Sequence, residues 1–158
     1  MAVLTNSGGA QLTTNAGKVI VRDTGSILQV GQGTTQSSST TSSQTFQSTN
    51  LFKSITPLSS TNKVLVFVNI NSTSSANGHT MITVYRDGTN LGDATWGFSS
   101  FFTGGQIQAK NSFQYLDSPG TTSSIEYKVY FRVLDTAQGS GDVATRGLNV
   151  ITLMEIAG

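Results

Sequence analysis

The sequence predicts an all-β fold, an antiparallel β-sandwich, and three observations support this prediction. Residues 123–135, SSIEYKVYFRVLD, alternate apolar side chains with charged or amphipathic ones at the period of a strand. Further short runs rich in Val, Ile, Thr and aromatic residues recur between turn signals, at spacings typical of a sandwich or jelly roll. No window of twelve residues shows a helical apolar stripe bracketed by capping residues. We therefore expect eight to ten strands.

The first elements divide the chain into an arm and a domain. Residues 1–25 mix small polar residues with two apolar patches, and we interpret them as an extended N-terminal arm. SILQV at residues 26–30 predicts the first strand of a domain that covers residues 26–158. The next run, residues 31–45, contains only Gly, Gln, Ser and Thr, which cannot bury enough apolar surface to become ordered alone. We expect this run to be a disordered, low-complexity loop.

The remaining strands follow in order along the domain. FQST and LFKSIT flank Asn50, and KVLVFVNIN at residues 63–71 is apolar on both faces, which predicts a central strand. Asp87-Gly88 is the strongest hairpin signal, because both residues accept a positive φ at low cost. ATWGFSSFFTGG, then NSFQYLDSPG with its Pro-Gly turn, predict two more strands, and GLNVITLMEIAG predicts the last.

Within residues 123–135 the register can be predicted for each side chain. The expected core-facing set is Ile125, Tyr127, Val129, Phe131 and Val133. The expected outward set is Glu126, Lys128, Tyr130, Arg132 and Leu134, which is mostly charged or amphipathic. One face of this strand therefore meets a core, and the other meets water or a neighbouring subunit.

The composition excludes several classes of partner and chemistry. The chain has 158 residues, the size of one domain, with 9 basic and 8 acidic residues, 23 Thr and 21 Ser, and a charged fraction of 11%. Because no basic patch is present, we expect neither nucleic acid nor an anionic membrane as a partner. The absence of cysteine excludes disulfides and thiolate chemistry. The N-terminal residues resemble no signal peptide, so we expect synthesis in the cytoplasm without conventional export.

Several strings together resemble virion proteins of tailed bacteriophages, cyanophages especially. The strings are GSILQVGQGTTQ, LFKSITPLSSTNKVLVFVNI, VYRDGTNLG, FQYLDSPGTTSSIEYKVYF and ITLMEIAG, in this order over residues 26–158. The resemblance implies a jelly-roll-like sandwich, broadly similar to tumour-necrosis-factor-like folds, that often assembles as a homotrimer. Only about 25 residues precede the matched region, which favours a small decorating protein over a long tail fibre.

Residues that could carry chemistry are few. His79 is the only histidine, and without a nucleophile elbow beside it we interpret it as a surface or turn residue. The aspartates, including Asp87, Asp93 and Asp117, lie beside turn residues, where a carboxylate accepts hydrogen bonds from backbone donors. A calcium site shared between trimer subunits is the alternative. We expect no enzyme, with no catalytic residue, metal or cofactor.

The aromatic residues between the hairpin and Gly104-Gly105 form the densest cluster of the sequence. Its members are Trp96, Phe98, Phe101 and Phe102. They are core residues of a strand, a subunit interface, or a sugar-stacking platform, and the last requires an exposed indole. We predict that these four residues form a subunit interface.

Two functions follow from these observations. The first is a trimeric capsid decoration or cement protein on the virion surface, bound to the major capsid protein or other virion proteins. In this hypothesis the arm is a strap that becomes ordered on the particle, through apolar anchors at Val3, Leu4, Val19, Ile20 and Val21. The alternative is a receptor-binding tail-fibre or appendage head that recognises host surface glycans.

Overall fold

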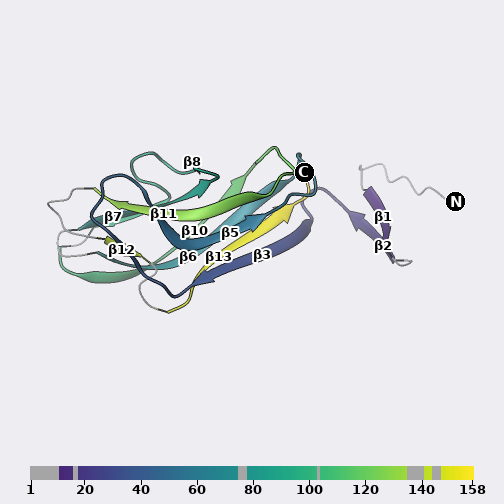
Figure 1. The fold of residues 1–158 in the computed structure, drawn as a ribbon. Helices are drawn as coiled ribbons and strands as arrows, with labels where there is room; N and C mark the ends of the chain where they lie inside the picture. Colours follow the sequence, from purple (N-terminus) through teal and green to yellow (C-terminus); the bar gives the residue numbers. More distant parts are fainter. Residues whose placement is uncertain (1–10, 16–17, 75–77, 103, 135–140, 144–146) are drawn as a thin grey trace.

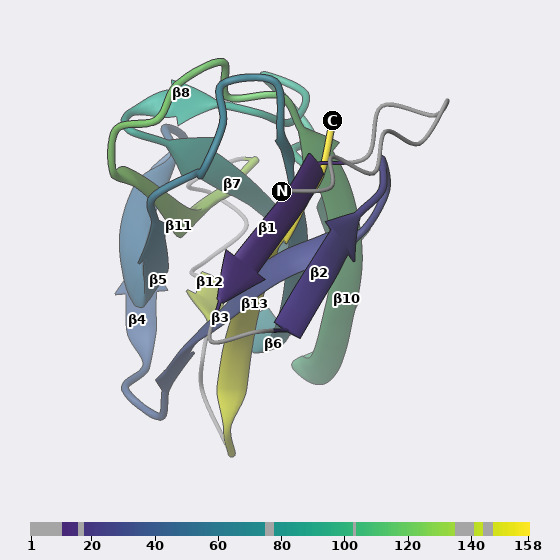
Figure 2. The same cartoon turned by 90° about the vertical axis from the view of Figure 1, so that its right-hand side faces the viewer.

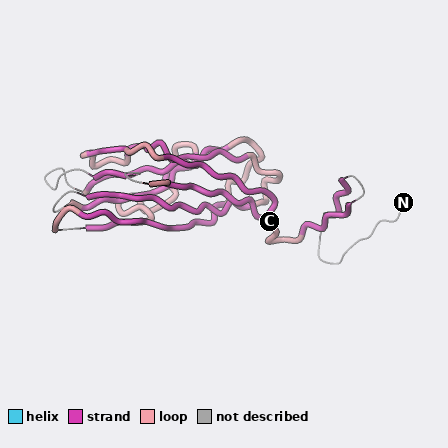
Figure 3. The backbone as a smooth tube through the Cα atoms, turned by 90° about the horizontal axis from the view of Figure 1, so that it is seen from below, coloured by secondary structure: helices cyan, strands magenta, loops and turns pink. Residues whose placement is uncertain are grey.

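The structure is a computed structural model, and it describes residues 11–15, 18–74, 78–102, 104–134, 141–143 and 147–158. Every regular element in these residues is a strand (Figure 3). Two antiparallel sheets pack face to face, and a hairpin stands beyond one end of them (Figure 1). The predicted all-β sandwich is therefore confirmed, and no helix long and apolar enough to span a membrane occurs among the described residues.

The first sheet is four strands wide, and two of these positions are each occupied by two successive strands. They are β3 (Ile27–Thr35) extended by β4 (Ser39–Thr41), β13 (Asn149–Ile156) extended by β12 (Gly141–Val143), β6 (Lys63–Ser74), and β10 (Ile107–Asp117). β6 pairs with β13 and β12 on one side and with β10 on the other. This confirms the central position predicted for the run that is apolar on both faces.

The second sheet contains β5 (Gln47–Ile55), β11 (Ile125–Val133), β7 (His79–Arg86), β8 (Thr89–Asn90) and β9 (Ser99–Phe102). FQST and LFKSIT belong to one continuous strand, β5, rather than to two. Taken in chain order, the eight strands of the sandwich that form this pattern are β3, β5, β6, β7, β9, β10, β11 and β13. One sheet contains the first, eighth, third and sixth of them, and the other contains the second, seventh, fourth and fifth. This alternation is the double Greek key of a jelly roll.

The core lies between the two sheets, where each strand contributes every second side chain. β11 alternates buried and half-buried residues along its whole length, so the predicted register holds, and Phe131 is only 1% exposed. From the other sheet Val64, Val66, Val68 and Ile70 face it and are all buried. The turn at Asp87-Gly88 has φ of 45° and 88°, as the hairpin signal predicts.

The expectation of a disordered loop at residues 31–45 is wrong for residues 31–35 and 39–41, whereas residues 36–38 and 42–45 lie outside the strands. Gly31–Thr35 continue β3, and Ser39–Thr41 form β4, because the backbone of these residues pairs with β13 and β12. At position 33 only a residue without a side chain fits. A Cβ at this position would overlap the carbonyl oxygen of Phe52 on β5, so the small residue lets the edges of the two sheets approach each other.

The arm also differs from the extended strap that the sequence suggests. β1 (Gln11–Asn15) and β2 (Lys18–Arg22) pair with each other as an antiparallel hairpin. The hairpin stands beyond the end of the sandwich that carries the C-terminus, and Figure 2 views the molecule from that end. The backbone bond from Gly25 to the Ala157 carbonyl fixes where the arm leaves the domain. We call this end the arm end and the opposite one the distal end.

Candidate functional site

A buried carboxylate at the arm end holds three segments together. Glu155 on β13 is fully buried and accepts hydrogen bonds from Leu58 N at 2.7 Å, Asn62 Nδ2 at 2.6 Å and Gln29 Nε2 at 2.5 Å. Burial alone would raise the pKa of Glu155, but these donors outweigh it and hold that pKa below its ordinary value. A charged Glu155 thereby fixes the loop between β5 and β6 to the first strand after the arm.

A second polar cluster joins the two sheets at the same end. Asp117 on β10 accepts two bonds from Arg86 Nη1, at 2.9 and 2.7 Å, and one from the Tyr127 hydroxyl at 2.7 Å. Burial raises the pKa of Tyr127 strongly, and the bond to Asp117 adds to this rise. The sequence-based interpretation of Asp117 as a turn-capping residue is therefore wrong. Its carboxylate ties β10 to β7 and β11.

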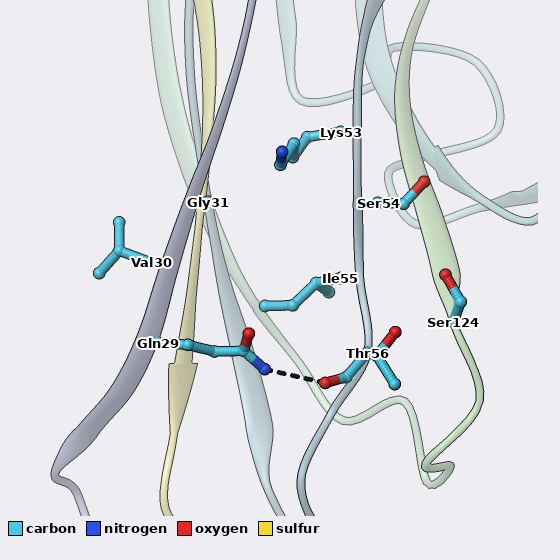
Figure 4. Close-up of a pocket in the computed structure, with 8 residues that line it drawn as sticks. All are labelled: Gln29, Val30, Gly31, Lys53, Ser54, Ile55, Thr56 and Ser124. Atoms are coloured by element: carbon cyan, nitrogen blue, oxygen red, sulfur yellow. Dashed lines mark hydrogen bonds between the residues drawn. The ribbon is translucent and has the colours of Figure 1, made fainter.

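A pocket of about 290 Å³ lies where the edges of β3 and β5 meet (Figure 4). Its lining residues are Gln29, Val30, Gly31, Lys53, Ser54, Ile55, Thr56 and Ser124. Gln29 closes one end by donating a hydrogen bond of 2.8 Å to the Thr56 carbonyl. The lining contains one cation, Lys53, but neither a carboxylate nor a histidine.

The described residues contain no group of three or more His, Asp or Glu side chains that could hold a metal ion. His79 begins β7 and contacts two aromatic rings rather than a carboxylate in the contacts that we identify. Asp87 accepts a bond from Glu126 N, and Asp93 accepts bonds from Thr95 N and Trp96 N. These backbone donors lower the pKa of Asp93. Asp93 thus caps a turn, as the sequence predicts. Asp87 instead accepts from the backbone of β11, so its interpretation as a residue that caps its own turn is wrong.

The most unusual surface is the outer face of the first sheet, where polar residues are expected. One residue from each of the four strands lies in register there, and we call this set the apolar row: Val30, Met154, Leu65 and Leu116. Val30 is 59% exposed and Leu116 is 47% exposed. Ile27 pairs with Ile156 beside the row, and Ile27 is 57% exposed, so the apolar surface continues to the arm exit.

The rest of this face and the outer face of β11 carry more polar or charged side chains than the apolar row. Two registers further along, the same four strands present Thr34, Val150, Asn69 and Ser112. The outer face of β11 carries Glu126, Lys128 and Arg132, and Lys128 Nζ lies 4.9 Å from the centre of the Phe52 ring. The apolar row and its extension to Ile27 therefore lie in the arm half of the first sheet.

The structure divides the predicted aromatic cluster into two groups. Phe98 packs against the core and stacks on Phe113, with ring centres 5.4 Å apart. Trp96 and Phe102 are exposed and each contacts the His79 ring, and Phe101 is half-buried. Sequence reasoning did not identify the apolar row, because its members lie on four strands that only the register brings together. The available sequence signal was the second apolar face of β6, which includes Leu65 and meets no core.

Of the predicted arm anchors, Val3 and Leu4 lie outside the described residues. Val19, Ile20 and Val21 lie in β2, where their backbones pair with β1. The pairing places these three residues in a hairpin rather than in an extended segment. Their role as anchors stays a prediction.

Comparisons with known proteins add little. No family model matches the sequence, and no curated protein matches it. Among solved structures, the chain is similar to the VP2 subviral particle of infectious bursal disease virus, with a TM-score of 0.48, 14% identity, and coverage of 95% of this chain and 43% of that one. The Gt strain of the same virus has a TM-score of 0.44 at 17% identity, covering 96% and 44%. The chain thus spans less than half of these proteins.

Proposed function

We propose that this chain is a virion structural protein that assembles as a homotrimer and decorates a capsid as a cement protein. The apolar row is the observation that carries the proposal. The row crosses four strands, with Val30 and Leu116 exposed and Leu65 and Met154 half-buried. Such an apolar row has no structural use on an isolated sandwich, whereas burying it between subunits removes it from water. The ordered series of phage-like strings over residues 26–158 supports the location on a virion.

Energetic reasoning favours association through this face. Burying apolar surface contributes about 25 cal/mol per Å². Among the described side chains of this face, the charged ones are Lys63, which pairs with Ile156, and Lys110, further along β10. Association therefore desolvates few charges. The charged outer face of β11 remains toward solvent in this arrangement. Low overall charge adds little repulsion between neighbouring copies.

The arm supplies the second contact of the proposed assembly. An isolated two-stranded hairpin is at best marginally stable in water, so β1 and β2 gain from an additional strand or a packing partner. The arm leaves the domain next to Ile27, at the end of the apolar surface. We infer that the hairpin packs on the capsid or on a trimer mate, as a strap that starts where the subunit contact ends.

Virion stoichiometry tests the location. Quantitative gel analysis of purified particles is expected to show a copy number comparable with that of the major capsid protein. A few copies per particle would contradict the cement hypothesis and place the protein on the tail. Deleting residues 2–25 should leave a folded sandwich that no longer binds particles lacking the native protein. Unchanged binding by this variant would contradict the strap.

The alternative, a receptor-binding fibre or appendage head, is favoured by one observation. The indole of Trp96 is exposed at the distal end of the sandwich, away from the arm. A head domain attached through its arm would present this end to a host surface. Copy number separates the two candidates, because a tail appendage is present in far fewer copies than the shell.

A further inference from the structure

The distal end carries an aromatic surface that the proposed trimer does not use. Trp96 is 46% exposed and Phe102 is 60% exposed, and the His79 ring contacts both of their rings. The His79 ring centre is 5.3 Å from that of Trp96 and 5.8 Å from that of Phe102, with the ring planes inclined at 45° and 70°. His79 and Phe102 are register partners on β7 and β9. We call these three residues the distal aromatic cluster.

The exposure of Trp96 is built into the backbone of its loop. Asp93 and Gly97 exchange backbone hydrogen bonds of 3.3 and 3.0 Å, and the Asp93 carboxylate accepts from Trp96 N at 2.7 Å. Gly97 has φ of 67°, and a Cβ there would overlap the Ile82 carbonyl. Arg132 Nε donates to the Thr95 carbonyl at 3.1 Å. The backbone that carries the indole is therefore fixed before any ligand binds, which lowers the entropy lost on binding.

The size of the cluster indicates what it binds. Aromatic side chains bury about 150–250 Å² each, so the exposed fractions of Trp96 and Phe102 offer roughly 200–250 Å². A stable protein interface needs about 800 Å² from each partner. One or two sugar rings need only the smaller area. The rings of Trp96 and Phe102 are inclined to that of His79 rather than coplanar with it.

The chemistry of the cluster fits the same ligand. The C–H face of a pyranose ring stacks on an indole, while the hydroxyl groups at its edge require hydrogen-bonding side chains. The His79 imidazole has one donor and one acceptor nitrogen when neutral. Ser100, exposed and on the same face of β9 as Phe102, adds a hydroxyl group.

We propose that Trp96, His79 and Phe102 form a carbohydrate-binding site that stacks on a hexopyranose ring of a glycan. The site is independent of the subunit contact, because β7 spans about 25 Å from His79 to the arm end at ~3.3 Å per residue. A protein attached to a virion through its arm and its sheet face presents this site outward. If the chain proved not to form a trimer, the proposed carbohydrate site would be unaffected.

Tryptophan fluorescence tests the proposal directly, because Trp96 is the only tryptophan of the chain. The full chain is titrated with oligomers of N-acetylglucosamine, with cellohexaose and with maltohexaose. At least one of them is expected to change the Trp96 emission saturably. Phe102→Ala and His79→Ala should each weaken that sugar about tenfold, whereas Phe52→Ala, at an exposed ring on β5 outside the cluster, should leave the affinity unchanged.

Three results would overturn the proposal. The first is no saturable change with any of the three sugars. The second is an equal loss of affinity in Phe52→Ala and Phe102→Ala while circular dichroism shows both variants folded. The third is a blue shift of the Trp96 emission with protein concentration alone, which would assign the cluster to contacts between copies of the chain.

Discussion

Replacing Glu155 with glutamine or leucine perturbs the buried carboxylate that holds the arm end together. The two carboxylate oxygens accept from Leu58 N, Asn62 Nδ2 and Gln29 Nε2. Glutamine has one acceptor oxygen and no charge, so it keeps at most two of these bonds in weaker form. Leucine keeps none and leaves buried donors unpaired, among them the Asn62 amide, whose residue is 5% exposed.

The magnitudes follow from the hydrogen bonds lost. A bond to a charged group contributes about 1.5–3 kcal/mol, and a buried donor left without a partner costs about 1–3 kcal/mol. Glu155→Gln is therefore expected to reduce the free energy of unfolding by about 2 kcal/mol, and Glu155→Leu by about 4 kcal/mol. For a domain of this size the first change lowers Tm by about 4–8 °C.

The pH dependence identifies the carboxylate itself. Because the folded pKa of Glu155 lies below its ordinary value of 4.5, its contribution is complete above that value. It is lost as the pH falls through the folded pKa. The native protein should therefore lose more stability between pH 5 and pH 3 than Glu155→Gln does, since the variant has no group to protonate there.

Urea denaturation followed by circular dichroism measures both effects, at one protein concentration for all variants because association adds stability. Equal stability of the native protein and Glu155→Leu at pH 7 would refute the reasoning. Parallel pH profiles for the native protein and Glu155→Gln would also refute it, since they would show that Glu155 is not charged in the folded state.

Two further substitutions test the core and the seam between the sheets. Phe131→Ala should lower the free energy of unfolding by about 3–5 kcal/mol, because Phe131 is buried between the sheets and its removal leaves a cavity. A loss below about 1 kcal/mol in a urea titration would contradict its buried position. Gly33→Ala should destabilise the domain, because its Cβ meets the Phe52 carbonyl, whereas Gly104→Ala meets no atom within 4 Å and should leave Tm within about 2 °C. Equal Tm values for these two variants would contradict the close approach of β3 and β5.

The alternation of side chains was sufficient to predict most of the sandwich. β11 carries a strong period-2 pattern, and a shift of one residue would expose every core side chain, so its register follows from the sequence. The run of β6 is apolar on both faces, which predicted its central position but not which face meets the core. The Asp87-Gly88 hairpin follows equally from its preference for positive φ. Residues 31–45 lacked such a signal. Their pairing depends on the edges of β13 and β12, which are more than 100 residues away along the chain.

The candidate sites were less accessible from sequence. Asp117 and Glu155 read as an ordinary turn residue and an ordinary strand residue, because their partners Arg86 and Asn62 are brought close only by the fold. The dense aromatic segment at residues 96–102 was identified from the sequence, but the fold places its side chains in different surroundings. Gly97 and the turn around it direct Trp96 outward, while the next residue, Phe98, points to the core.

The central claim, that the apolar row is a subunit contact, is tested most directly by sedimentation equilibrium of three proteins. The native chain should sediment at micromolar concentration as a species of three times its 16.6 kDa mass. Leu116→Lys places a charge in the row and should sediment as the monomer, whereas Ser112→Lys, on the same face of β10 but outside the row, should remain a trimer. A monomeric native chain, or a trimer that Leu116→Lys leaves intact, would contradict the account.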